Sequence, residues 1–209
     1  MEQKLYELQD MVKVGCGGCM GCSSCCEGMG DTIIVDPYDV YRLTEGLNLS
    51  FEAMLQNGLL SLRVEEGVIL PHLTMNEKNR CVFLNDAGRC SIHESRPGLC
   101  RIFPLGRQYK DGRIFYFLLD ECKKSGKVKM KVEKWIDTKH TRVNEQFLLR
   151  WHDYIKQFRA YAKETIREEG GETVMKQKNM LLLQTFYFTP YRDDFYEEFE
   201  ERLNYMQNL

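Results

Sequence analysis

The chain has 209 residues, a charged share of 29% and a formal net charge of −2, which is typical of a globular protein and excludes disordered and fibrous classes. This balance gives no reason to expect a nucleic-acid or membrane partner. No window holds the roughly 18 uncharged apolar residues that a spanning helix requires, and residues 1–14 lack the apolar core of a secretory signal. We therefore expect a cytoplasmic protein.

The first predicted feature is a loop rich in cysteine and glycine. Five of the nine cysteines lie within eleven residues: Cys16, Cys19, Cys22, Cys25 and Cys26. Glycine lets the backbone fold closely around an inorganic group, and its N–H groups can donate to sulfur. Because a reducing compartment keeps thiols reduced, we interpret these cysteines as metal ligands and not as a disulfide framework.

The spacing of these cysteines favours iron over zinc. Four of them have the C-x2-C-x2-C-x3-C spacing of bacterial ferredoxins: Cys16, Cys19, Cys22 and Cys26. Glu27 stands where ferredoxins usually have proline. Zinc sites commonly use two separated C-x2-C pairs, whereas the later cysteines stand singly: Cys81, Cys90, Cys100 and Cys122. We favour an iron–sulfur cluster, of the 4Fe–4S type, and keep zinc as the alternative.

The adjacent pair Cys25-Cys26 bears on the number of metal centres. Neighbouring side chains of extended backbone point to opposite sides, so we expect these two thiols not to chelate one metal equally. This predicts either two metal centres or one multinuclear cluster. Nine cysteines fill two four-ligand sites with one left over, and either Cys16 or Cys26 is the candidate for the spare.

Short strands and helices are predicted after the loop. Residues 32–35 are β-branched like a strand. Asp36-Pro37 is a good N-cap and first-turn pair for a helix that ends at Gly46. Ser50 caps a second short helix. Residues 60–64 and 68–73 form a hairpin, and Asp111-Gly112 turns another that leads the chain from Cys100 back to Cys122.

The remaining chain is predicted to be helical. Apolar residues recur every three or four positions over 143–169 and again over 195–206, which indicates helices that pack on the core or on another subunit. The lysine-rich run 123–134 is interpreted as a solvated linker, with a phosphate-binding patch as the alternative. We thus predict an α+β fold, with a metal-stapled domain over 1–128 and a helical region over 129–209 that packs on it and offers a surface for a protein partner.

Several motifs together carry a family resemblance. They are Cys19-x2-Cys22-x2-Cys25-Cys26, Cys81-Val82-Phe83-Leu84, Cys90-Ser91-Ile92-His93-Glu94 and Arg96-Pro97-x2-Cys100-Arg101-x-Phe103-Pro104. In these motifs the chain resembles the YkgJ-type cysteine-cluster family, also named for its CxxCxxCC motif, whose members are described as zinc- or iron-chelating domains. The resemblance covers roughly Cys19 to Cys122.

The resemblance implies metal ligation by eight cysteines: Cys19, Cys22, Cys25, Cys26, Cys81, Cys90, Cys100 and Cys122. Cys16 is an addition to the family pattern. Flagellin lysine N-methylases have a similar cysteine pattern within a longer chain, which makes protein methylation a third function beside an iron–sulfur protein and a structural zinc module. The chain lacks a glycine-rich fingerprint for S-adenosylmethionine, and the sequence does not decide whether the protein is an enzyme.

Charged residues near Cys100 are candidates for a supporting role. Arg96 and Arg101 flank this cysteine and are predicted to screen a thiolate-rich centre or to hold an anionic ligand, with ordinary salt bridging as the alternative. His93 is the best candidate for a ligand other than cysteine, because it lies between Cys90 and Cys100. The other histidines are interpreted as structural.

Overall fold

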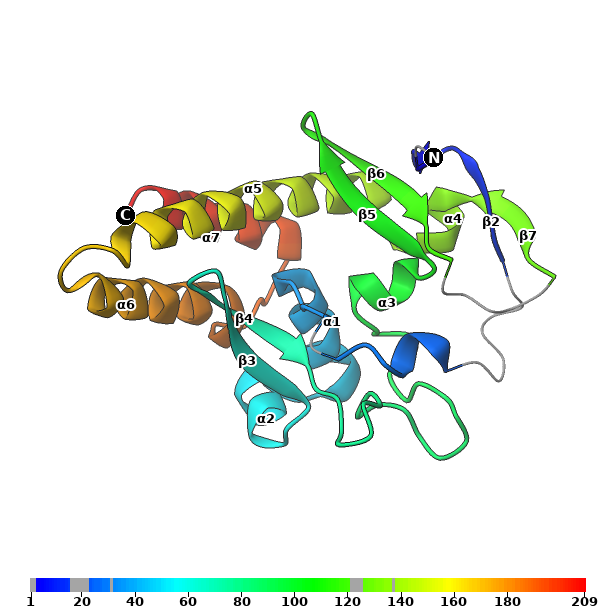
Figure 1. Cartoon of the computed structure of the whole chain (residues 1–209), viewed down its shortest axis with the longest axis horizontal. Helices are drawn as coiled ribbons and strands as arrows, with labels where there is room; N and C mark the ends of the chain where they lie inside the picture. Colours follow the sequence, from blue (N-terminus) through cyan, green and yellow to red (C-terminus); the bar gives the residue numbers. More distant parts are fainter. Residues whose placement is uncertain (1–2, 16–22, 31, 121–125, 137) are drawn as a thin grey trace.

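The computed structural model describes residues 3–15, 23–30, 32–120, 126–136 and 138–209 (Figure 1). The strands are β1 (Leu5–Tyr6), β2 (Met11–Gly15), β3 (Leu60–Glu65), β4 (Val68–Leu73), β5 (Leu105–Lys110), β6 (Arg113–Leu118) and β7 (Val128–Lys131). The helices are the 3-10 helix η1 (Ser24–Cys26), α1 (Pro37–Leu47), α2 (Phe51–Gln56), α3 (Gly98–Ile102), α4 (Val132–Ile136), α5 (Thr141–Thr165), α6 (Gly171–Leu183), the π-helix η2 (Gln184–Phe188) and α7 (Phe195–Gln207).

The strands form small antiparallel sheets in the orders β1-β6-β5, β2-β7 and β3-β4. Both predicted hairpins are confirmed. Glu66 and Gly67 turn β3 into β4, and Asp111 and Gly112 turn β5 into β6, all four with positive φ. Such turns match the right-handed twist of the paired strands, which explains why the two Xaa-Gly dipeptides were informative.

Helix α1 begins as predicted but ends later. Asp36 accepts from the Asp39 backbone N–H at 2.8 Å and Pro37 opens the first turn. The predicted end at Gly46 is wrong, because the helix continues to Leu47 and Asn48 takes the left-handed conformation at its end. Gly46 instead lies against the turn at Ser95. A Cβ on residue 46 would lie 2.6 Å from Ser95 Cβ and closer still to its Oγ, so close packing is what requires glycine.

The predicted strand over 32–35 is reduced to one bridge. Ile34 pairs with His72 of β4, and the flanking backbone groups complete the contact, with Val35 N donating to Pro71 O and Leu73 N to Ile33 O. The segment therefore runs along the edge of β4 without forming a regular strand. Ser50 caps α2 as predicted, accepting from Ala53 N at 3.1 Å.

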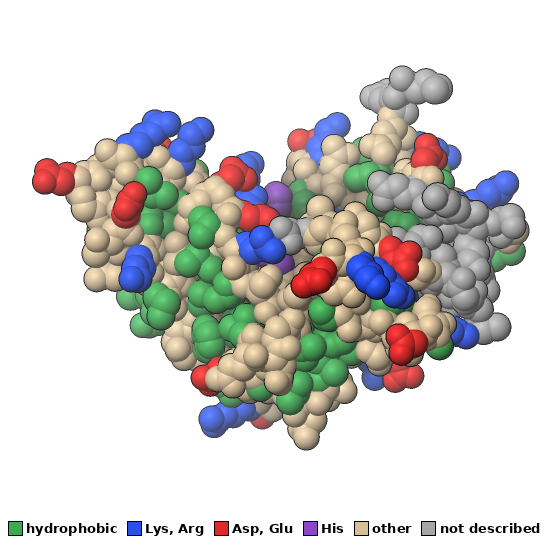
Figure 2. All heavy atoms as spheres, turned by 60° about the horizontal axis from the view of Figure 1, so that its bottom comes forward, with side chains coloured by type: hydrophobic (Ala, Val, Ile, Leu, Met, Phe, Trp, Pro, Cys, Tyr) green, Lys and Arg blue, Asp and Glu red, His purple; other side chains and the backbone are tan. Residues whose placement is uncertain are grey.

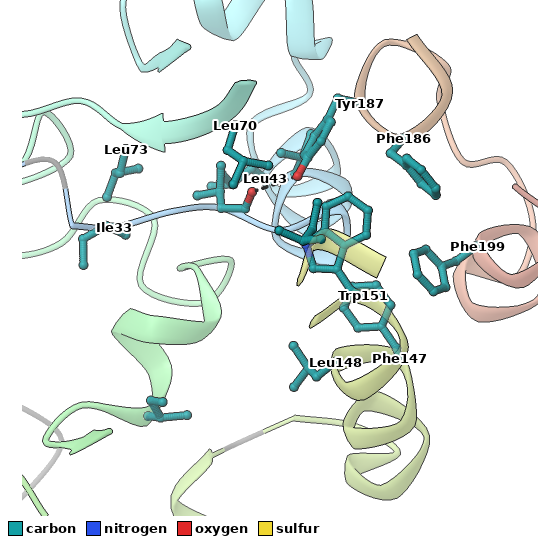
Figure 3. Close-up of a cluster of buried hydrophobic side chains, with 14 of the residues drawn as sticks. Ile33, Leu43, Leu70, Leu73, Phe147, Leu148, Trp151, Phe186, Tyr187 and Phe199 are labelled. Atoms are coloured by element: carbon teal, nitrogen blue, oxygen red, sulfur yellow. Dashed lines mark hydrogen bonds between the residues drawn. The ribbon is translucent and has the colours of Figure 1, made fainter. Parts of the chain in front are cut away.

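The predicted helices of the second half are confirmed as α5 and α7, and they enclose an aromatic core. Figure 3 shows Phe147 and Trp151 of α5 facing Phe186 of η2 and Phe199 of α7. The ring centroids of Phe147 and Phe199 are 4.6 Å apart in a T-shaped pair, a geometry that aromatic rings prefer. Tyr187 of η2 also donates to Val35 O at 3.3 Å, which ties this core to α1 and β4.

The lysine-rich run is only partly the solvated linker that the sequence favours. Residues 121–125 lie outside the described residues, but β7 pairs with β2 and α4 follows it directly. Val132 and Ile136 are buried, at 0% and 4% exposed. Val132 at the end of the run and Ile136 just after it therefore pack into the core, although the run is rich in lysine. Figure 2 shows acidic and basic side chains interspersed over one face of the protein, without a large patch of one sign.

The described strands and helices confirm the α+β class. The division into 1–128 and 129–209 stays a prediction, as does the protein partner for the C-terminal helices. Within the described part of the chain, no helix is long and apolar enough to cross a membrane.

The contact of Gly46 with Ser95 generates a test of stability. Alanine normally stabilises a helix interior by about 1 kcal/mol over glycine. We expect Gly46→Ala to lower the free energy of unfolding instead, by about 1–3 kcal/mol, because the added methyl overpacks the contact. Denaturant unfolding of Gly46→Ala, with Glu45→Ala on the exposed side of the same helix as the control, measures this. A gain in stability for Gly46→Ala would contradict the packing argument.

Candidate metal centre

All five cysteines that the structure describes line one cavity of about 390 Å³. They come from two stretches of chain that are far apart in sequence, one with Cys25 and Cys26 and the other with Cys81, Cys90 and Cys100. The other lining residues are Leu73, Arg89, Ile92, His93, Arg96 and Pro97. The cavity lies where η1, the irregular segment between β4 and α3, and α3 itself come together (Figure 1).

Cys25 and Cys26 lie in η1, and their Sγ atoms are 3.8 Å apart. The expectation that these two thiols point to opposite sides is therefore wrong. It assumed extended backbone, whereas Cys26 N donates to Ser23 O at 2.7 Å and closes a helical turn. In such a turn, neighbouring side chains can both face the same cavity, and both thiols are available to it.

Backbone hydrogen bonds hold Cys81 and Cys90 beside this pair. Cys81 N donates to Cys26 O at 2.8 Å. Leu84 N donates to Cys81 O at 3.0 Å, and Leu84 in turn forms a bridge with Cys90. Each cysteine segment is therefore anchored to the next by main-chain contacts, which do not depend on the thiol side chains.

The turn that follows Cys90 is anchored to neighbouring chain as well. Ser91 N donates to Phe83 O at 2.8 Å, and Arg42 of α1 donates to Glu94 O. Cys100 lies in α3, whose N-cap residue Pro97 also lines the cavity. Helix α1 thus supports the wall of the cavity that carries Cys90.

The two predicted arginines take different positions. Arg96 lines the cavity, and its Nη1 lies 2.8 Å from His93 Nε2. Because arginine has no acceptor, His93 Nε2 accepts this hydrogen bond, so its lone pair is not directed at a metal. Arg101 is 4% exposed, is not among the lining residues, and donates to Arg96 O at 2.8 Å. Its predicted contact with an anionic ligand stays a prediction.

The pKa values of the thiols divide into two groups. A hydrogen bond from the Cys26 thiol and the charge of Arg96 lower the pKa of Cys25 to about 7 and that of Cys90 to about 6. Sharing its proton with both neighbours raises the pKa of Cys26. Burial raises the pKa of Cys81 and Cys100. The site can therefore carry two thiolates near neutral pH without a metal.

Backbone amides also face the sulfur atoms. Burial raises the pKa of Cys81, and a hydrogen bond from the backbone at Phe83 partly offsets that rise, while one from the backbone at Ile92 helps to lower the pKa of Cys90. Amide donors of this kind stabilise thiolates that bind a metal. The donor set of the cavity is thus suited to an iron or zinc centre with sulfur ligands.

The remaining predicted ligands lie outside the described residues: Cys16, Cys19, Cys22 and Cys122. Among the residues that are described, no three cysteine, histidine or acidic side chains are arranged to hold a single metal ion. The five thiols share a cavity without closing around one ion. Sequence reasoning missed Leu73 and Arg89 as lining residues, since neither belongs to the motifs that carry the cysteines.

The divided pKa values predict selective alkylation of the metal-free protein. At pH 7 we expect iodoacetamide to modify Cys90 at least about tenfold faster than Cys100, because the thiolate is the nucleophile. Lowering the pH to 5 protonates Cys90 and should slow its reaction. Arg96→Gln should raise the pKa of Cys25 and Cys90 and slow both at pH 7. Peptide mass spectrometry measures each rate.

Arg113→Gln is the control for this measurement, since Arg113 of β6 does not line the cavity and pairs with Glu7 at 2.7 Å. Equal rates for Cys90 and Cys100, or equal effects of the two arginine substitutions, would refute the proposed distribution of charge.

A comparison with known protein families agrees with the chemistry of this cavity. The model of the CxxCxxCC family, described as a putative zinc- or iron-chelating domain, matches residues 18–123, just over half of the chain. The match spans every cysteine that lines the cavity. No curated protein and no solved structure matches the chain. The family match nevertheless covers enough of the sequence to assign it: the chain belongs to the CxxCxxCC family of zinc- or iron-chelating domains.

Proposed function

We propose that the protein carries an iron–sulfur cluster, of the 4Fe–4S type, in the cavity lined by its cysteines. The observation that supports this most is the gathering of five thiols around a space of about 390 Å³. A single tetrahedral ion takes four ligands at about 2.3 Å and leaves no room between them. A 4Fe–4S cluster also takes four thiolates, but it is larger than a single ion, so the space between these thiols is better suited to a cluster.

The charge around the cavity supports the same proposal. Several thiolates in one place repel one another unless cations and amide dipoles offset them. Arg96 and the backbone at Ile92 act on Cys90 in this way, and Arg89 adds a second guanidinium to the lining. Cysteines of the segment 16–22 and Cys122 would supply further ligands, as their place in the family motif implies.

The chemistry that a bound cluster of this kind supplies is electron transfer, with a potential set by hydrogen bonds to its sulfur atoms and by its exposure to solvent. The residues of this chain hold the thiols, donate to them and partly exclude water. Cys26 and Cys81 are buried, at 8% and 5% exposed, whereas Cys25, Cys90 and Cys100 are half-buried. One side of the site is therefore open to a partner or substrate.

A structural zinc site is the second candidate, and one distance favours it. Two thiolates on one tetrahedral zinc ion lie about 3.8 Å apart, since each bond is about 2.3 Å long. The Sγ atoms of Cys25 and Cys26 have this separation, 3.8 Å. In that case the metal would stabilise the irregular segments around the cavity, and the helices would provide the interaction surface.

Metal and acid-labile sulfide analysis of anaerobically purified protein separates the two candidates. We expect iron with matching sulfide and a brown colour. Cys81→Ser should remove most of the bound iron, because it deletes a buried donor of the cavity. His93→Ala should retain the iron, because His93 directs its Nε2 to Arg96 and not to the metal.

Two outcomes would overturn the iron–sulfur proposal. Stoichiometric zinc without iron or sulfide would make the site structural, and chelation should then unfold the cavity region. Equal loss of iron from Cys81→Ser and His93→Ala would mean that the thiols of the cavity are not its specific ligands.

A further inference from the structure

The segment from Arg96 to Cys100 has two faces. Three of its side chains, Arg96, Pro97 and Cys100, line the cysteine cavity. Its opposite face is turned to the first turn of α1, where Gly98 N donates to Asp39 Oδ1 at 2.7 Å. The short helix that presents Cys100 is therefore attached to the rest of the fold through a carboxylate.

Asp39 joins the start of α1 to the segment from Arg96 to Arg101. Its Oδ2 accepts from Asp36 N at 3.4 Å, which completes the cap of α1. Its Oδ1 accepts from Gly98 N and lies 3.7 Å from Arg101 Nη1. The same Nη1 donates to Arg96 O at 2.8 Å. One buried ion pair thus holds the backbone on both sides of Pro97.

Both partners of this pair are buried, with Asp39 2% and Arg101 4% exposed. Burying two charges costs desolvation energy, and well-packed apolar residues of similar size often give equal or greater stability. The pair is therefore expected to add little to the free energy of unfolding by its charges. Its hydrogen bonds, however, have directions that apolar side chains lack, and they end on the backbone of Arg96 and Gly98, shortly before Cys100.

We propose that Asp39, acting through Gly98 N and Arg101, is a positioning residue that holds Cys100 and Arg96 at the cavity. The inference rests on the proposed metal-binding function, because its purpose is to preset a ligand and its neighbouring cation. Neither Asp39 nor Arg101 touches the metal in this proposal. They fix the position of the Cys100 thiol in the metal-free protein.

The test uses the full-length double variant Asp39→Leu/Arg101→Met. It removes both charges together, so that no buried charge is left unpaired, and it removes the acceptor for Gly98 N. We expect this variant to stay folded with a lower unfolding midpoint, because the buried N–H of Gly98 loses its acceptor. We expect Cys100 of the metal-free protein to be alkylated several-fold faster and Cys90 more slowly, because Arg96 is no longer held beside Cys90, with the rate at Cys81 unchanged. Zn²⁺ affinity, measured by titration against a chelating dye, should fall about 10- to 100-fold.

The matched control is Glu198→Leu/Arg202→Met on α7. Arg202 pairs with Glu198 at 2.8 Å and donates to Thr185 O and Thr189 O, so it also holds backbone, but far from the cavity. We expect this variant to leave both the Cys100 rate and the Zn²⁺ affinity unchanged. If the first double variant does not fold, Asp39→Asn replaces it. This variant keeps an oxygen for Gly98 N but loses the charge, so both effects should be smaller and in the same direction.

The two readouts separate the proposals. If the wild type binds neither Zn²⁺ nor reconstituted iron and sulfide, the proposed function fails, while the Cys100 rate still tests the positioning. A folded Asp39 variant with wild-type alkylation of Cys100 and wild-type Zn²⁺ affinity would overturn the inference. Equal changes in the α7 control would overturn it too, since they would show a general effect on stability.

Discussion

The hydrogen bond from Cys81 N to Cys26 O is the contact on which the arrangement of the cavity depends. The segments that carry the cysteines contain little regular structure, so their positions rest on a small number of main-chain hydrogen bonds. The contacts of Leu84 with Cys81 and Cys90 extend this chain of attachments. Because none of them involves a thiol, the backbone of the cavity can form while all five sulfur atoms remain available to a metal.

The C-terminal helices add an aromatic core to the fold. The aromatic side chains of α5, η2 and α7 form a core whose rings meet edge to face, as Phe147 does with Phe199 and Trp151 with Phe186. Asn179 of α6 then ties the β3-β4 hairpin to the helices by accepting from Ile69 N and donating to Gly67 O. The same core continues to the cavity, since Cys26 and Cys81 are among its buried members.

The sequence was informative where one local signal decides the outcome. The turn at Asp111-Gly112, the cap at Asp36 and the apolar stripe of α5 are such cases, and all three are confirmed. The predicted helix end at Gly46 was wrong, because the sequence does not distinguish a glycine that ends a helix from one that leaves space for a neighbouring turn, here at Ser95. Asp39 was missed for a similar reason: its partners Gly98 and Arg101 lie some sixty residues away.

The space between the thiols separates the two candidate metals more strongly than any single distance. The 3.8 Å between the sulfur atoms of Cys25 and Cys26 satisfies one edge of a zinc tetrahedron. A zinc ion bound there would need only two of the three other thiols in the cavity, Cys81, Cys90 and Cys100. A 4Fe–4S cluster is likewise held by four thiolates, so the number of thiols fits either metal. The cavity of about 390 Å³, with Arg96 at its wall, has both the space and the positive charge that a multinuclear cluster requires.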